Sequence, residues 1–239
     1  MNSTLRSITG MGDRLTRWIS QRDVDAGLVR EVRSYVQSIR WKIRFLDHHS
    51  ALLCAVQWDK VGRLGSVCIP EDMVDLRVKD GLLMRLGTSE TVTMIIWTSF
   101  DGAVAACVNA CDTLGRLINR VYGLGIDEHR ANLPGVANKL NAKCPLGVPM
   151  YQEPGLQWMK PLRSLRGRCQ HADLSEVLLQ GYGSSALEPL VHRDYCLDGT
   201  EGIPVSDYAS MVKARTLELL TVCANTITSG PELAVRIID

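Results

Sequence analysis

The sequence is poor in aromatic residues and carries almost no net charge. Aromatic side chains make up 5% of the 239 residues, and only two of them are Phe. Proteins that hold single-stranded nucleic acid on platforms of several stacked rings need more of them, so we expect no such platform. The formal net charge of +1 gives no global field that would draw the chain to nucleic acid or to an acidic membrane. Any anion binding must therefore come from a local basic patch.

Long apolar runs and paired cysteine motifs are also missing. No uninterrupted apolar run reaches the length of a membrane span, and residues 1–18 lack the apolar segment of a signal peptide. The eight cysteines include no C-x-x-C pair, which disfavours a zinc cluster. We therefore expect a cytoplasmic protein with reduced cysteines, no membrane contact, and no metal or other cofactor. Cys107 and Cys111, one helical turn apart, are expected to pack in the core.

Helical periodicity is the main feature that the sequence does contain. Apolar residues follow the i, i+3, i+4, i+7 spacing of one buried stripe from position 25, and a second pattern runs from Thr91 over about seven turns. The first stripe comprises Leu28, Val32, Tyr35, Val36, Ile39, Ile43 and Leu46. Glycines at 123 and 125 end the second pattern, and a further amphipathic stretch begins near Pro204. These patterns predict an all-α fold.

Two other parts of the chain complete the expected organisation. A helix is predicted near 156–171, with a continuation over 173–180. Residues 61–90 have short apolar runs between Gly and Pro, a pattern that fits either helices or strands. The predicted arrangement is an N-terminal helical region, residues 1–90, that packs on a helical domain of residues 91–239, as two parts or as one continuous domain.

Three short motifs resemble functional signatures without their usual context. His192-Arg193-Asp194 matches the start of a kinase catalytic loop, but no glycine-rich loop or strand lysine accompanies it, which favours a turn with local ion pairing. Residues 181–186 have the outline of a dinucleotide fingerprint without a βαβ unit around them. Asp47-His48-His49 has the residue types of a metal site, but no second acidic cluster joins it. For all three motifs we favour the structural interpretation.

The stretch RSLRGRCQHADLSEVL combines three arginines with a histidine. Arg166 and His171 form an Arg-x4-His arrangement, and on a regular helix their side chains point about 140° apart, so they can flank one groove. Arginine offers a planar fork of donors that suits a phosphate, and histidine exchanges a proton near neutral pH. Together they suit metal-free cleavage of RNA, in which the 2′-OH attacks the adjacent phosphate. A solvated, charged helix face is the competing interpretation.

The spacing alone is not specific, because Arg44 and His49 have it too. This second pair follows the first amphipathic stripe, and the same two interpretations apply to it. We expect the N-terminal region that carries it to pack against the rest of the chain and to shape substrate access or dimerisation.

Three segments together resemble the HEPN superfamily (higher eukaryotes and prokaryotes nucleotide-binding domains). They are SFDGAVAACVNACDTLGRLINRVYGLGI, WMKPLRSLRGRCQHADLSEVL and YASMVKARTLELLTVCANTI, within residues 91–228. HEPN domains are helical bundles, and many are ribonucleases of toxin–antitoxin, CRISPR-associated or abortive-infection systems. Their signature is Arg, a polar residue, three variable residues and His, of which Arg166 and His171 match the first and last positions.

The resemblance implies roles and partners. It implies a homodimer with two motifs facing one composite cleft, His171 as the proton-transfer residue and Arg166 as the group that stabilises the phosphate. Lys160, Arg163 and Arg168 would guide the RNA, and the chain would act in stress response or phage defence, with an antitoxin or another defence protein as a possible partner.

Gly167 stands where the family usually has a polar residue. This departure keeps a second interpretation open, a HEPN-like module that binds RNA or nucleotide without cutting it. A third interpretation is a helical subunit with a purely structural role in a larger complex.

Overall fold

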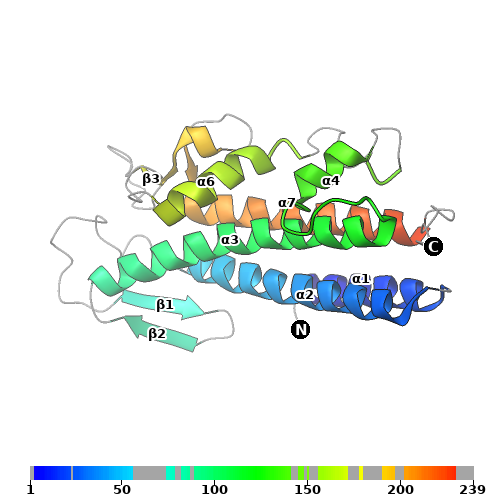
Figure 1. The fold of residues 1–239 in the computed structure, drawn as a ribbon. Coiled ribbons are helices and arrows are strands. Elements are labelled where there is room, and N and C mark those ends of the chain that lie inside the picture. Colours follow the sequence, from blue (N-terminus) through cyan, green and yellow to red (C-terminus); the bar gives the residue numbers. More distant parts are fainter. Residues whose placement is uncertain are drawn as a thin grey trace. The chain divides into compact units, whose positions relative to one another are not determined.

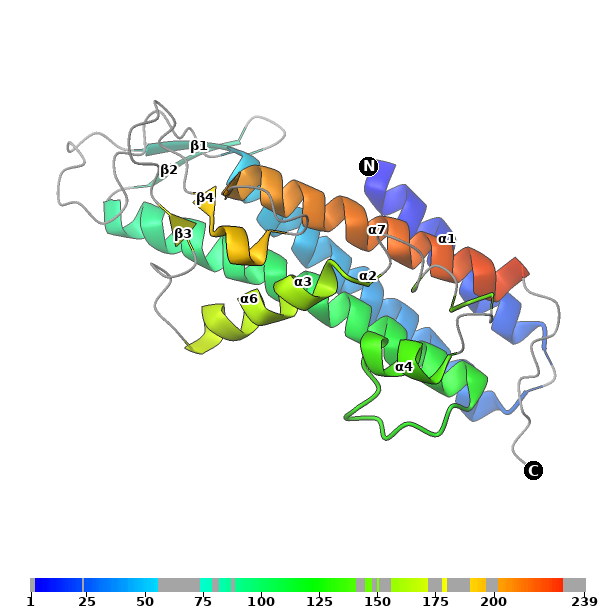
Figure 2. The same ribbon diagram turned by 90° about the horizontal axis from the view of Figure 1, so that it is seen from above.

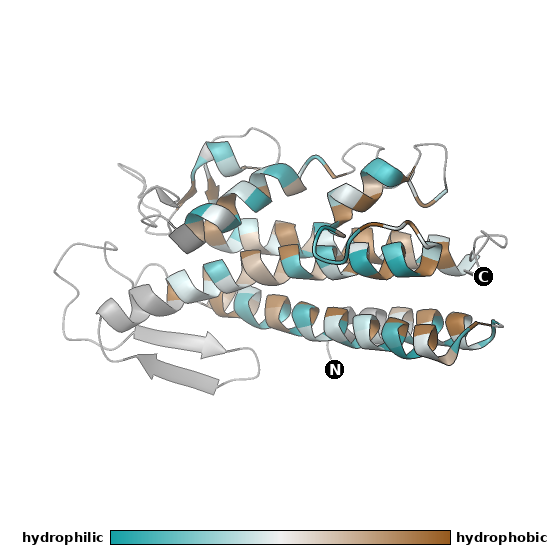
Figure 3. Cartoon of the chain, viewed as in Figure 1, coloured by the Kyte–Doolittle hydropathy of each residue, from teal (hydrophilic) through white to brown (hydrophobic). Residues whose placement is uncertain are grey.

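The structure is a computed structural model that describes residues 3–22, 24–55, 74–78, 82–86, 89–140, 145–147, 150, 156–171, 178–179, 190–196 and 202–229. The chain is all-α, as its periodicity predicts (Figure 1). The helices are α1 (Ser3–Ser20), α2 (Ala26–Ala55), α3 (Ser89–Tyr122), α4 (Leu133–Lys139), α6 (Met159–His171) and α7 (Val205–Ser229). Apolar and polar residues alternate along these helices, as amphipathic packing requires (Figure 3).

Short strands form two small antiparallel sheets. β1 (Val74–Val78) pairs with β2 (Leu82–Leu86), within the part of the chain where the sequence left helix and strand open. The second sheet has the order β3 (Leu178–Leu179), β4 (Leu190–Val191) and β5 (Ile203–Pro204). The predicted helical continuation over 173–180 is therefore wrong at Leu178 and Leu179, which pair with β4 instead. The 3-10 turn η3 (Arg193–Tyr195) follows β4.

The described residues form two compact units. Unit 1 comprises those within residues 1–44, 107–157 and 214–239, and unit 2 comprises those within residues 45–106 and 158–213. α2, α3 and α7 each contribute one part to unit 1 and the other part to unit 2. The division at residue 90 that the sequence suggests stays a prediction.

The core of unit 1 is built from the predicted stripes of α2 and α3 and from α7. Its buried side chains include Val32, Val36, Ile39, Ile43, Cys107, Cys111, Leu114, Ile118, Leu220 and Cys223. The Cys107 Sγ lies 2.7 Å from the Thr216 Oγ1. Contact with Cys107 and burial raise the pKa of the Cys111 thiol. Cys107 and Cys111 thus pack in the core, as predicted.

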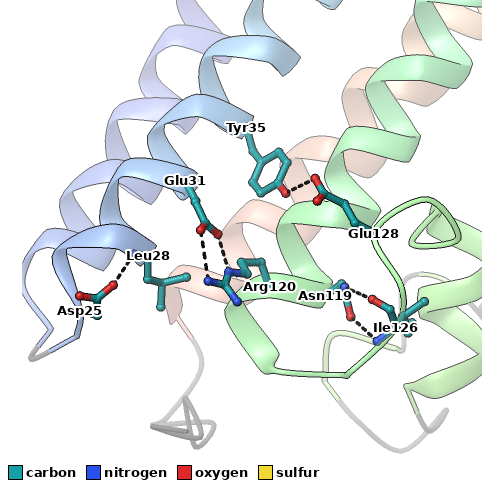
Figure 4. Close-up of polar contacts among 8 residues, drawn as sticks. All are labelled: Asp25, Leu28, Glu31, Tyr35, Asn119, Arg120, Ile126 and Glu128. Carbon is teal, nitrogen blue, oxygen red and sulfur yellow. Dashed lines mark hydrogen bonds and ion pairs between the residues drawn. The ribbon is translucent and has the colours of Figure 1, made fainter.

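A close approach and a tight turn shape the end of α3 in unit 1. A Cβ atom at Gly115 would lie 2.6 Å from the backbone nitrogen of Leu133, so only glycine lets α4 approach α3 here. α3 ends at Tyr122, and Gly123 and Gly125 follow in the left-handed region, with φ of 58° and 68°. Asn119 holds the turn: its Nδ2 donates to the Ile126 carbonyl at 2.8 Å, and its Oδ1 accepts from the Ile126 N–H at 3.1 Å (Figure 4).

In unit 2, α6 and η3 pack around the first part of α3 and the start of α7. Both views show α6 alongside the first part of α3 (Figures 1 and 2), and α6 contacts η3. The rings of Phe100 and Tyr208 lie 6.0 Å apart in the core. The Tyr208 hydroxyl donates a hydrogen bond of 3.0 Å to the Tyr195 carbonyl, which fixes η3 on α7. Helix α6, which carries the candidate motif, therefore contacts a turn that is itself fixed to α7.

Candidate functional site

Helix α6 is held by one apolar face and is basic elsewhere. Met159, Leu162 and Leu165 are buried and recur at the spacing of one helix face. The other positions include one lysine, three arginines and a terminal histidine, whereas the 13 residues include no Asp or Glu. A helix of this composition has no carboxylate of its own to offset its positive charge. Such a helix suits an anionic ligand.

The four cations that the sequence predicts at the site differ in how exposed they are on α6. Lys160 and Arg168 are exposed, whereas Arg163 and Arg166 are half-buried beside the apolar face. The Nε of Arg166 is buried, and no acceptor for it is found among the described residues. A buried donor without a partner is costly, and natural proteins usually satisfy it with water, an ion or a ligand. Arg166 thus has a buried donor that a further acceptor would satisfy.

His171 is the last residue of α6, as the sequence predicted. Its side chain lies outside the described part of the structure, so its distance from Arg166 stays a prediction from helical spacing. Gly167, between the two, is exposed, and a Cβ atom there would meet nothing within 4 Å. The motif therefore has open space at the position where HEPN domains usually have a polar side chain.

The second Arg-x4-His pair is occupied by other contacts. The Arg44 guanidinium lies over the ring of Trp41, 4.8 Å from its centroid. The imidazole of His49 packs on α3 at Gly102, where a Cβ atom would lie 2.5 Å from the His49 Nε2. Burial, and after it the charge of His48, lowers the pKa of His49, whereas Asp101 acts in the opposite direction.

Asp101 is the residue of unit 2 that sequence reasoning missed. Its negative charge acts on His49 of α2 and, after burial, raises the pKa of Cys169 of α6 to about 12. The Asp101 Oδ1 is buried, with no donor among the described residues. The signal in the sequence is a lone carboxylate at the start of the small-residue stretch DGAVAACVNAC. The structure thus brings Asp101 close to both His49 of α2 and Cys169 of the motif helix.

The described side chains include no group of three or more His, Cys, Asp or Glu that could hold a metal ion. In the candidate cluster at residues 47–49, Asp47 is engaged in an ion pair with Lys213, and both side chains are mostly buried. At the kinase-like motif, the His192 Nδ1 lies 3.3 Å from the Asp194 Oδ2, and the Asp194 N–H donates to the same nitrogen at 3.2 Å. The start of that motif is a turn, as predicted, and its described contact is a hydrogen bond to the imidazole. Ion pairing within it stays a prediction. The dinucleotide-like residues 181–186 lie outside the described residues.

Comparisons of the chain with known protein families, characterised proteins and solved structures gave no match. Within the part of the chain that the structure describes, no helix is both long and apolar enough to cross a membrane.

Proposed function

We propose that the chain is a HEPN-like, metal-independent endoribonuclease of a stress-response, toxin–antitoxin or phage-defence system. The observation that carries the proposal is α6 itself: a helix with four cations and no carboxylate, in which the Nε of Arg166 is buried without an acceptor among the described residues. A phosphate oxygen is the natural acceptor for such a guanidinium, because its planar fork matches phosphate geometry.

In the proposed reaction, His171 takes the proton of a ribose 2′-OH, and the 2′-oxygen forms a bond to the adjacent phosphorus. The bond from phosphorus to the 5′-oxygen breaks, and that oxygen takes up a proton from water, which regains one from His171. The products are a 2′,3′-cyclic phosphate and a 5′-hydroxyl. Arg166 stabilises the charge that develops on the phosphoryl oxygens. Lys160, Arg163 and Arg168 attract the RNA backbone, which makes binding sensitive to salt.

The proposal includes partners of the kind that the HEPN resemblance implies. The chain acts in the cytoplasm as a homodimer in which two copies of α6 face one composite cleft. An antitoxin or another defence protein controls it. A mixture of Arg166→Ala and His171→Ala chains tests the composite cleft, because a mixed dimer with one intact half-site from each chain regains activity only if the two residues act across the interface.

The deciding experiment is cleavage of a broad RNA panel in EDTA by the wild-type chain, Arg166→Ala and His171→Ala, with end-group analysis of the products. His129→Ala and Arg130→Ala are matched controls, because both residues are exposed in the loop before α4. We expect 2′,3′-cyclic phosphate ends from the wild type and both controls, and a loss of about 100-fold or more in each motif variant. Equal cleavage by His171→Ala and the wild type contradicts the proposal.

The open space at Gly167 favours one alternative, a module that binds RNA or nucleotide without cutting it. That alternative predicts RNA binding that depends on Arg166, together with no cleavage by the wild-type chain. The same set of proteins separates the two functions, since a binding assay and a cleavage assay can be run on each variant.

A further inference from the structure

The part of α2 in unit 1 has an exposed face that carries arginines and one indole. Relative to Trp41, the exposed residues on this face fall within a sector of about 100° at the helical spacing of 100° per residue. They are Arg30, Arg33, Ser34, Gln37, Trp41 and Arg44, which we name the arginine–tryptophan face. From Arg30 to Arg44 the face extends about 21 Å along the helix, at a rise of 1.5 Å per residue.

Positive charge on this face is not compensated by α2 itself. Residues 26–44 include five cations and a single carboxylate, Glu31. Glu31 lies about 80° away from Trp41 around the helix. It is bound by Arg120 of α3, whose Nη2 donates to Oε1 at 3.1 Å while its Nε donates to Oε2 (Figure 4).

The two cations of this stretch that do not belong to the face are already engaged. The Lys42 ammonium donates to the Ser38 Oγ at 2.8 Å and to the Thr113 Oγ1 at 2.5 Å. Arg40 forms an ion pair of 2.6 Å with Asp13 of α1. On the face itself, the Arg33 Nη2 donates to the Ser20 Oγ of α1 at 3.2 Å, so this exposed arginine is also tied to α1. Arg40 and Lys42 thus help to fix the packing of unit 1, whereas the arginines of the face are exposed to solvent.

Trp41 is the unusual member of the face. Its side chain is 49% exposed, although a large indole normally contributes its area to a core. The Arg44 guanidinium lies over the Trp41 ring, 4.8 Å from the ring centroid, in a cation–π contact. An indole beside arginines offers stacking to a nucleobase and hydrogen bonds to the phosphates next to it.

A protein partner fits this face less well than a nucleic acid does. A stable protein interface needs about 800 Å² of surface from each partner, with an apolar centre. Trp41 is the one large apolar side chain of the arginine–tryptophan face. The other exposed ones in the described chain are Val222 of α7 and Phe45, which lies four residues after Trp41 on α2 but belongs to unit 2. Three arginines around one indole instead match a chain of phosphates and bases.

We propose that the arginine–tryptophan face binds single-stranded RNA. Trp41 stacks on one base, and Arg30, Arg33 and Arg44 contact successive phosphates. The inference rests on the proposed function, because RNA is the substrate class of that reaction. It names a second RNA-binding surface, in unit 1, besides the motif of α6 in unit 2. It also adds a preference for unpaired over double-stranded RNA, since a base in a duplex is not free to stack on an indole.

The test is binding of a fluorescent oligouridylate to full-length chains that all carry His171→Ala, so that the strand stays intact. Trp41→Ala is expected to weaken binding about 10- to 100-fold, the loss typical of one stacked base, and Trp41→Phe is expected to keep most of the affinity. Replacing Arg30, Arg33 and Arg44 together by Gln should lower the slope of log affinity against log salt by about 2, at roughly 0.7 per phosphate contact. Val222→Ala and Arg130→Gln are the matched controls and should leave affinity unchanged.

Stacking also has a spectroscopic signature. The chain has five tryptophans, so the quenching by oligouridylate that is lost in Trp41→Phe belongs to Trp41. Unchanged affinity and unchanged quenching in a folded Trp41→Ala chain overturn the inference. So does a Trp41→Ala chain that changes only its oligomeric state, since that result makes the face a protein interface.

The outcomes for the two proposals are separate. If the chain without the His171→Ala substitution binds RNA through Trp41 but does not cut it, the endoribonuclease proposal is wrong and the proposed binding face remains. If cleavage depends on His171 but Trp41→Ala binds and cuts RNA normally, the proposed binding face is wrong and the endoribonuclease proposal remains.

Discussion

The imidazole of His49 in α2 packs directly against Gly102 of α3. A Cβ atom at position 102 would be 2.5 Å from the His49 Nε2 and 2.7 Å from two of its ring carbons. Contacts that short do not occur between real atoms, so the absence of a side chain at 102 is what admits the ring. The pair joins α2 to α3 inside unit 2, beside Asp101 and the motif helix.

Gly102→Ala should therefore destabilise the protein, although alanine is the better helix former. We expect the free energy of unfolding in urea to fall by about 1–3 kcal/mol, the usual cost of overpacking. In a His49→Ala background the same change should be neutral or stabilising by about 0.5–1 kcal/mol, because only the helix propensity remains. Gly10→Ala in α1, where a Cβ atom meets nothing within 4 Å, is the control and should stabilise. Equal effects of Gly102→Ala in both backgrounds contradict the contact.

The same histidine makes stability depend on pH. Burial lowers the pKa of His49 from its ordinary 6.5, with a further contribution from His48, while the Asp101 carboxylate opposes the shift. The unfolded chain therefore takes up a proton at a higher pH than the folded chain does. The contribution of neutral His49 is complete above about pH 6.5 and is lost as the pH falls from there through the folded-state pKa.

Urea midpoints between about pH 7.5 and pH 5 measure this linkage. His49→Gln should flatten the fall of the midpoint toward low pH, while the exposed His129→Gln should leave the profile of the wild type unchanged. A profile that His49→Gln does not alter would show that the imidazole is equally easy to protonate in both states.

The periodicity of the sequence predicts the helices of this chain well, because each long helix buries one continuous stripe. Ile39, Ile43 and Leu46 lie on the predicted stripe and are buried, and the left-handed Gly123 and Gly125 follow the end of α3. The prediction is wrong at Leu178 and Leu179, where two apolar residues fit a helix face as well as a strand. Their pairing with β4 depends on residues more than ten positions away, which a local pattern does not contain.

The candidate site is predicted from the sequence only in part. The basic residues of α6 stand out because they are close together in the chain. Asp101 is separated from both His49 and Cys169 by long stretches of sequence, and only folding brings it near the two. In the same way, the exposure of Trp41 depends on which residues pack around α2. A stripe pattern would place this aromatic residue on the polar face but would not say what that face carries.

The thiol of Cys169 tests the position of Asp101. Burial and then the Asp101 carboxylate raise the pKa of Cys169 to about 12, so little thiolate is present at pH 8. We expect iodoacetamide to modify Cys169 much more slowly than the exposed Cys54, as measured by peptide mass spectrometry. Asp101→Asn should speed the reaction of Cys169 several-fold, whereas Asp112→Asn, next to Cys111 in unit 1, should not. Fast labelling of Cys169 in the wild type would be inconsistent with its burial beside a carboxylate.

Gly167 allows a test of the proposed ribonuclease. The position is exposed and open, so a side chain fits without moving any neighbour. Gly167→Asn supplies the polar group that HEPN motifs usually have, and one additional well-placed hydrogen bond of about 1.4 kcal/mol would raise kcat/KM roughly tenfold. Gly167→Ala is the matched control, because it removes the same backbone freedom and adds no polar group. Both variants should raise thermal stability by a few tenths of a kcal/mol to about 1 kcal/mol, since glycine is a poor helix former. Faster cleavage by Gly167→Asn but not by Gly167→Ala would show that a polar side chain at position 167 contributes to catalysis. Equal gains in Asn and Ala would instead mean that a stiffer α6, and no new polar contact, is what the site needs.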